Sequence, residues 1–210
     1  FPNNALTQDH ILSTWAGVRP VIGAENSKNP SKERRDHAVW TDKGLVTVSG
    51  GKLTTFRLIA LDALAAAERN LPSPKEFIDD SMFPTPSLSS DSLLPENTSL
   101  AQRLLGRYGE KAKILLETST ANERLTIGET EFSMAECRWA IRNEAVEHLD
   151  DLLLRRTRLG MCLPNGGDSL FPALKALFFS ERNWDDELWQ KELDRYKAIW
   201  QRHYSLPQKS

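Results

Sequence analysis

The spacing of hydrophobic positions changes along the chain near residue 72. Before this point, two short β-rich runs, His37–Trp40 and Leu45–Ser49, precede a helical pattern that begins at Lys52. In that pattern, apolar residues recur every three or four positions until Leu71 and Pro72 end it. The first part of the chain therefore reads as a small strand-rich piece with one helix.

A stretch rich in proline, Leu71–Asn97, separates this piece from the rest. It carries five prolines among many Ser and Asp residues, a composition that buries little surface and resists regular structure. We interpret it as a linker or a long extended crossover. The predicted division is residues 1–72, a linker at 73–96, and a helical domain at 97–206.

The last part reads as about five helices, so the fold class predicted overall is α+β, with an all-α domain at the C-terminal side. Ser133–Glu136 has the capping-box pattern that begins a helix. Asn183 is predicted to cap a last helix that carries Trp189, Tyr196 and Trp200 on one face. The other predicted helical stretches are Asn97–Arg107, Glu110–Thr118, a stretch through Leu149 towards Arg156 with a break near Asn143, and Leu170–Phe179.

Composition narrows the function classes. The 210 residues carry a net charge of −2, which argues against a bulk nucleic-acid binder. No apolar run approaches the roughly 20 residues of a membrane-spanning helix. The two cysteines, Cys137 and Cys162, lack metal-binding spacing and are expected to be reduced thiols of a cytosolic protein. Because the chain starts at Phe1 without an initiator Met or a signal peptide, we expect a piece of a longer protein.

The segment Gly44–Arg57 carries the first candidate chemistry. Two glycines, Gly50 and Gly51, stand between a predicted strand and a predicted helix, where they allow a tight turn and close approach of the backbone to a ligand. The free N–H groups and positive dipole end of the helix stabilise an anion, and Lys52 adds a full charge. Thr54 and Thr55 add hydroxyl groups in the first turn, so the pattern favours an anionic ligand at Gly50–Thr55. A structural turn with a solvated Lys remains the alternative.

The second candidate is Arg19, within the β-leaning run Trp15–Ile22. An Arg between small residues on a strand can grip a carboxylate or phosphate with two hydrogen bonds. An ordinary surface ion pair explains the same pattern.

These two motifs, together with Ala140–Ala145 and Leu149–Arg158, resemble the FAD-dependent glycerol-3-phosphate dehydrogenases in content and order. The resemblance implies an FAD-binding fold with a C-terminal helical domain, and oxidation of sn-glycerol 3-phosphate to dihydroxyacetone phosphate. It also implies that hydride passes to FAD and that the electrons go onward, to quinone in the membrane or to oxygen in the oxidase branch. It further implies a peripheral enzyme at the cytoplasmic face of the inner membrane, with a homodimer as an option.

By motif match, Arg19 holds substrate near the flavin and Lys52 lies beside both. The Gly50–Thr55 backbone faces the flavin pyrimidine edge, where the reduced ring carries negative charge. The implied catalytic residues are Arg19 and Lys52, and Thr54 joins them in substrate binding. The implied cofactor-binding residues are Gly50, Gly51, Lys52, Leu53, Thr54 and Thr55.

The dinucleotide fingerprint of a flavoprotein is absent from the sequence. We therefore expect this chain alone to be inactive. The alternative is a non-catalytic helical module for interaction or dimerisation. For Arg155, Arg156 and Arg158, either docking of the helical domain or a phosphate contact fits the pattern.

Overall fold

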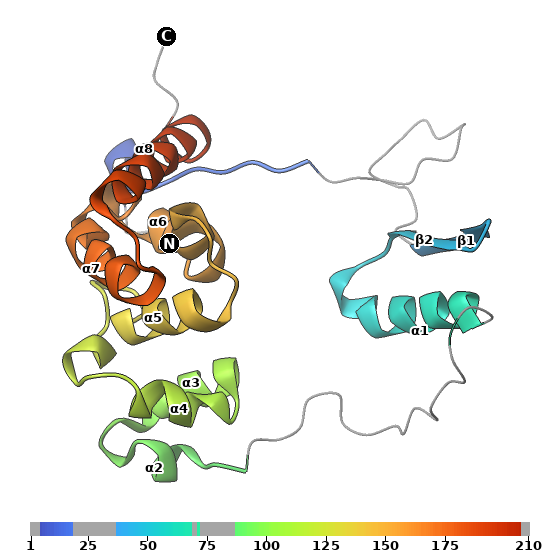
Figure 1. The fold of residues 1–210 in the computed structure, drawn as a ribbon, viewed down its shortest axis with the longest axis horizontal. Helices are drawn as coiled ribbons and strands as arrows, with labels where there is room; N and C mark the ends of the chain where they lie inside the picture. Colours follow the sequence, from blue (N-terminus) through green and yellow to red (C-terminus); the bar gives the residue numbers. More distant parts are fainter. Residues whose placement is uncertain (1–4, 19–36, 69–70, 72–86, 207–210) are drawn as a thin grey trace. The chain divides into compact units, whose positions relative to one another are not determined.

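The computed structural model describes residues 5–18, 37–68, 71 and 87–206. The chain divides into two units, one of Phe1–Ala16 with Thr85–Ser210 and one of Gly17–Pro84 (Figure 1). The larger unit is helical and the smaller contains a two-stranded sheet. The predicted fold class, a small α+β piece with a helical C-terminal domain, is confirmed.

In its described part, the smaller unit contains an antiparallel hairpin of β1 (His37–Asp42) and β2 (Leu45–Gly50). Both turn residues, Lys43 and Gly44, have positive φ, at 48° and 86°. Two residues of positive φ match the right-handed twist of the paired strands, which is why this turn closes a tight hairpin. A 3-10 turn, Leu53–Thr55, then leads into the helix α1 (Phe56–Ala67).

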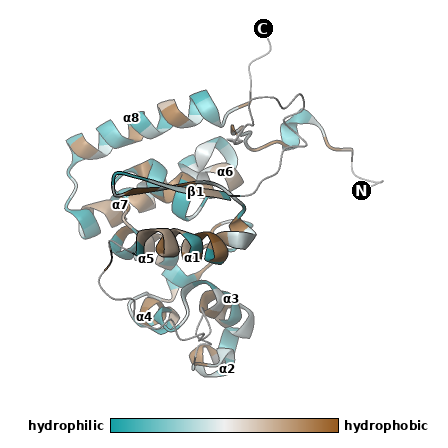
Figure 2. Ribbon diagram, turned by 90° about the vertical axis from the view of Figure 1, so that its right-hand side faces the viewer, coloured by the Kyte–Doolittle hydropathy of each residue, from teal (hydrophilic) through white to brown (hydrophobic). Residues whose placement is uncertain are grey.

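None of the described residues of this unit is buried. Large apolar side chains stand out into solvent, with Leu53 at 88% and Leu45 at 67% exposure. Figure 2 shows hydrophobic colour over much of α1. Two strands and one helix enclose too little volume to remove such side chains from water.

The larger unit contains short and long helices joined by tight turns (Figure 1). Its α-helices are α2 (Ser90–Leu93), α3 (Thr98–Tyr108), α4 (Lys111–Glu117), α5 (Met134–Asn143), α6 (Leu159–Cys162), α7 (Phe171–Arg182) and α8 (Asp186–His203). The predicted capping box is present at α5, where the Ser133 hydroxyl accepts from the Glu136 N–H and the Glu136 carboxylate accepts from the Ser133 N–H.

Two clusters of buried apolar side chains stabilise the helical unit. One lies among α2, α3, α4 and the start of α5, around Leu104 and Leu115. The other joins α5, the segment after it, α6, α7 and α8, around Phe178 and Tyr196. Because α5 contributes to both clusters, it connects the two halves of the unit.

The N-terminal stretch lies on the helical unit. The Ser13 hydroxyl donates to the Met161 carbonyl at 2.9 Å. Thr14 donates from its N–H to the Tyr204 carbonyl at 2.8 Å and from its hydroxyl to the Ser205 carbonyl at 3.0 Å. The predicted division groups this stretch with residues 1–72 instead, because pairing over such sequence distances has no local signal. Trp15–Val18 is not a strand, and residues 19–22 lie outside the described ones.

Two helix boundaries differ from the sequence prediction. Asn183 ends α7 with a left-handed φ of 53°, and Asp185 caps α8 instead, accepting from the Leu188 N–H at 2.8 Å. The predicted cap was wrong because Asn suits both a helix start and a left-handed helix end. Beyond the break after α5, residues Asp151–Arg156 form a π-helical turn.

Candidate functional site

The turn between β2 and the helical segment of the smaller unit requires both of its glycines. Gly50 and Gly51 have φ of 80° and 86°, in the region that favours glycine. A Cβ on Gly51 would collide with the Ile59 side chain and lie 3.3 Å from the Cβ of His37. The helix therefore packs directly against the hairpin at this point, and the turn has no room for a side chain.

The next residues present an electropositive surface. Lys52 and Thr54 are exposed, and neither the 3-10 turn nor α1 has an acidic residue in its first turn. The first N–H groups of a helical segment have no partner within it and carry partial positive charge. The Thr55 hydroxyl is already engaged within the turn, because it donates to the Lys52 carbonyl at 3.0 Å. The arrangement can accept an anionic group.

One further hydrogen bond fixes the orientation of this turn. The His37 Nε2 lies 2.6 Å from the Asp62 Oδ2, which ties the first strand to the middle of α1. His37 is therefore a structural group. Gly50–Thr55 thus form the predicted turn between strand and helix, whereas Arg19 lies outside the described residues. The assignment of both to a ligand site stays a prediction.

The Leu149–Arg158 motif builds a buried charge cluster. Asp150 has 1% exposure and accepts from both Arg155 and Arg195, so it joins the π-helical turn to α8. Burial alone opposes ionisation, but the hydrogen bonds from the two guanidinium groups outweigh it and lower the pKa of Asp150. This carboxylate is therefore ionised and structural.

The other arginines near the motif hold neighbouring segments together. The Arg156 Nε donates to the Glu144 carbonyl at 2.7 Å, and Arg107 donates to the Arg156 carbonyl at 2.7 Å. Arg142 donates to both Glu181 oxygens at 2.5 and 2.8 Å, which links α5 to α7. These contacts lie inside the helical unit, and docking of this unit on another domain stays a prediction.

The aromatic stripe of α8 is part of the core, as its spacing indicates. The Tyr196 hydroxyl, in a side chain of 1% exposure, donates to the Gly166 carbonyl at 2.6 Å. The Trp200 Nε1 donates to the Gly160 carbonyl at 2.7 Å. A Cβ on Gly160 would collide with the Tyr196 hydroxyl, so this glycine lets α8 approach closely.

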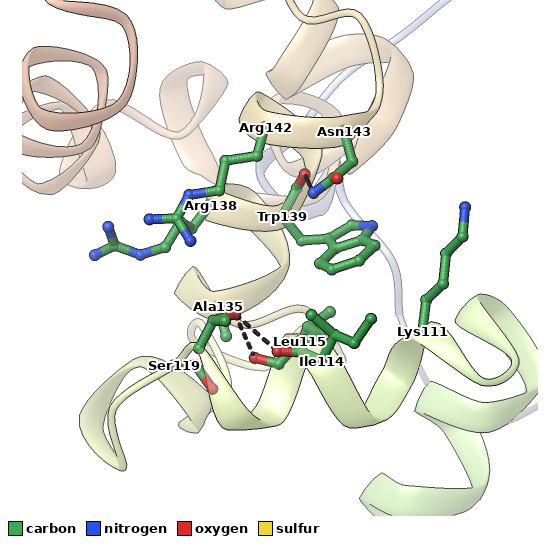
Figure 3. Close-up of a pocket in the computed structure, with 10 residues that line it drawn as sticks. Lys111, Ile114, Leu115, Ser119, Ala135, Arg138, Trp139, Arg142 and Asn143 are labelled. Atoms are coloured by element: carbon green, nitrogen blue, oxygen red, sulfur yellow. Dashed lines mark hydrogen bonds between the residues drawn. The ribbon is translucent and has the colours of Figure 1, made fainter.

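A pocket of about 320 Å³ between α4 and α5 was not predicted from the sequence (Figure 3). The Trp139 ring extends from α5 over Ile114 and Leu115 of α4, with Lys111 and Arg142 at the edges. In the sequence, the indication of this pocket is the apolar residue Ile114 on the otherwise polar face of α4. In the structure this side chain is 51% exposed. Glu181 pairs with Arg142 and with Arg138, so much of the positive charge at the edge is neutralised.

Both cysteines are free thiols, in different surroundings. Cys137 is fully buried, and burial raises the pKa of its thiol to about 12. Cys162 is exposed at the end of α6. A protonated, buried thiol is inert, so Cys137 acts as a small apolar core residue.

Comparison with known proteins identifies relatives over most of the chain. Residues 85–188 match the family described as the C-terminal domain of alpha-glycerophosphate oxidase. The chain is 28% identical over 206 residues to the mitochondrial glycerol-3-phosphate dehydrogenase of Macaca fascicularis, which covers 90% of this chain. It is 32% identical over 177 residues to glycerol-3-phosphate dehydrogenase 2 of Mycobacterium bovis, covering 77% of this chain. The predicted relationship to the C-terminal part of this enzyme family is confirmed.

The chain spans a minor part of these relatives, 28% of the macaque protein and 30% of the mycobacterial one. The matched C-terminal domain falls in the helical unit, from α2 into α8. In the described part of the chain, no helix combines the length and apolar character needed to cross a membrane.

Proposed function

We propose that this chain, whose residues 85–188 belong to the family of the alpha-glycerophosphate oxidase C-terminal domain, is part of an FAD-dependent oxidoreductase. The proposed reaction is oxidation of sn-glycerol 3-phosphate to dihydroxyacetone phosphate, with electrons passing onward to quinone. Its relatives are named glycerol-3-phosphate dehydrogenases, which supports the reaction class. The proposed location is the cytoplasmic face of the membrane, as a peripheral protein.

The observation that carries the proposal is the turn at Gly50–Thr55. Its residues fit the edge of an anionic ring or a phosphate: two glycines without side chains, first-turn N–H groups, and an exposed Lys52 and Thr54 with no acidic residue in that turn. FAD, when bound, would supply the hydride acceptor. In this proposal Gly50, Gly51 and Leu53 would hold the flavin through their backbone, while the Thr55 hydroxyl keeps the turn closed by its hydrogen bond to the Lys52 carbonyl.

The proposed role of Lys52 rests on this turn, and that of Arg19 rests on the sequence motif alone. Lys52 would place its ammonium group beside the developing negative charge of the ring and beside the substrate phosphate or hydroxyl. Arg19 would hold the substrate with its planar guanidinium group. Neither residue would transfer a proton, since both act as fixed positive charges that orient the substrate.

The helical unit has a second role in this proposal. Its buried ion pairs and glycine contacts give a rigid body that can pack beside the flavin domain of the same enzyme or form a homodimer contact. A purely non-catalytic helical module is the competing function, and it is favoured by the self-contained clusters of this unit.

The test compares two lysines of the smaller unit in the full-length enzyme. Lys52→Gln is expected to lower kcat/KM for glycerol 3-phosphate by about 10²-fold, with flavin content and melting temperature retained. Lys43→Gln removes the same charge from the exposed hairpin turn and is expected to leave activity unchanged. Equal activity of both variants would refute the assignment of the turn to the active site.

The present chain gives a complementary test. Mixed with FAD and glycerol 3-phosphate, it is expected to show neither turnover nor stoichiometric flavin binding, because the proposed turn contacts only one edge of the cofactor. Tight flavin binding by this chain would show that its own residues suffice, contrary to the proposal.

A further inference from the structure

A hollow lies in the helical unit between the N-terminal stretch and the end of α8. Its volume is about 750 Å³, and Trp15, Arg158, Met161, Arg202, His203 and Tyr204 line it. A neighbouring hollow of about 430 Å³ shares Trp15, Arg202 and His203 with it. Within the described part of the chain, no acidic residue lines either hollow.

The arginines of this hollow differ from the other arginines of the unit. Arg103, Arg138, Arg142 and Arg155 pair with carboxylates. Arg107, Arg124 and Arg156 instead donate hydrogen bonds to backbone carbonyls. Arg158 and Arg202 are exposed, and neither forms an ion pair with any residue that the structure describes. Two guanidinium groups without protein carboxylates face a hollow large enough for a small organic molecule.

Stabilisation of the C-terminal end of α8 explains only some of the positive charges around this hollow. Arg202 and His203 lie in the last turn of α8, where positive charge offsets the helix dipole. Arg158 belongs to a different segment, between the π-helical turn and α6, and its φ of 58° is unfavourable for a side-chain-bearing residue. The helix dipole of α8 therefore does not explain why an arginine from this second segment lines the same hollow.

The aromatic residues of the hollow give it a second chemical character. Trp15 is 74% exposed, although hydrogen bonds of Ser13 and Thr14 fix the backbone immediately before it. Tyr204 is half-buried at the opposite chain segment. An exposed, positioned indole beside two guanidinium groups suits the organic part of a ligand whose other end is an anion.

We propose that this hollow binds a phosphate-bearing ligand, with Arg158 and Arg202 on the phosphate and Trp15 against its organic part. The volume exceeds that of inorganic phosphate alone, which leaves room for the esterified group. The phosphate can belong to a soluble ester or to a lipid headgroup. This site is separate from the turn at Gly50–Thr55, because all of its residues lie in the helical unit.

The test follows the Trp15 indole N–H resonance in the ¹⁵N-labelled chain, assigned with Trp15→Phe. The probes are inorganic phosphate, glycerol 3-phosphate, and vesicles of phosphatidylglycerol or of phosphatidylcholine. We expect a saturable shift in the millimolar range. Arg158→Gly and Arg202→Gln are each expected to weaken binding by about tenfold or more, since each removes a charge-assisted hydrogen bond. Arg158→Gly suits the left-handed backbone, so this variant should keep the fold.

Lys191→Gln is the matched control, since it removes an exposed positive charge from α8 away from the hollow. It is expected to bind as the parent chain does. Saturation by glycerol 3-phosphate identifies a soluble ester as the source of the phosphate, and a response to phosphatidylglycerol vesicles alone identifies a lipid headgroup. The proposal fails if no probe gives a saturable shift, or if the two arginine variants bind as tightly as the Lys191 variant.

Discussion

The carboxylate of Glu136, which has no exposed surface, accepts two hydrogen bonds from the guanidinium group of Arg103, at 2.8 and 2.5 Å. Arg103 belongs to α3 and Glu136 to the first turn of α5, so the pair joins the two clusters of the helical unit. The Tyr108 hydroxyl donates to the same carboxylate at 3.1 Å. Burial and this neighbouring negative charge raise the pKa of Tyr108 well above its ordinary value.

Replacing Arg103 by Met is expected to destabilise the helical unit by about 3 kcal/mol, because it leaves a buried carboxylate without its charged partner. Urea unfolding followed by circular dichroism measures the change. Lys113→Met is the control, since the Lys113–Glu117 pair is long, at 3.8 Å, and exposed. Its loss should change stability by no more than about 0.5 kcal/mol. Similar values for the two variants would contradict a structural role of the buried pair.

The lowered pKa of Asp150 predicts how the stability of the helical unit depends on pH. Since its pKa is lower in the folded chain than the ordinary 3.8, the folded state binds fewer protons than the unfolded state below about pH 5. Its contribution is therefore complete above the unfolded pKa and is lost as pH falls through the folded one. Glu181, whose pKa the hydrogen bond from Arg142 lowers from 4.5, adds a term of the same sign.

The measurement is the free energy of unfolding from pH 7 to pH 3. In Asp150→Asn the chain should be less stable at neutral pH, and its stability should fall less steeply on acidification. A slope that is the same in Asp150→Asn and in the parent chain would show that this carboxylate is not a source of the pH dependence.

Alanine substitutions at Gly51 and Gly44 distinguish the cost of backbone strain from the cost of a side-chain collision. Both have φ of 86°, but a Cβ on Gly44 meets no atom within 4 Å, whereas one on Gly51 strikes Ile59. Gly44→Ala is expected to cost about 1 kcal/mol from the left-handed backbone alone. Gly51→Ala should cost more, because the Ile59 side chain must also shift and loosen the contact of α1 with the hairpin. Hydrogen exchange of the α1 amides measures both effects, and equal exchange in the two variants would rule out close packing at Gly51.

Much of the local structure could be predicted from the sequence, because short-range patterns determine it. Two β-rich runs predict the two strands, and three- to four-residue spacing predicts α1. Their antiparallel pairing about Lys43 and Gly44 came from the structure. The capping box at Ser133 marks the start of α5 to the residue. The Gly50–Thr55 turn of the candidate site was predictable for the same reason, since its glycines, Lys52 and Thr54 are contiguous. Its assignment to flavin and substrate stays a proposal.

The remaining features were decided by tertiary structure, since they depend on partners far away in the sequence. Asp150 pairs with Arg195, Glu136 with Arg103, and Thr14 with Tyr204 and Ser205. No local pattern distinguishes these residues from solvated charges and hydroxyls. Only packing of the helices removes water from the carboxylates and makes their arginine partners necessary. The sequence by itself thus determined the helices, the two strands and the glycine turn. The folded chain decided which charges are buried and which, such as Arg158 and Arg202, stay exposed.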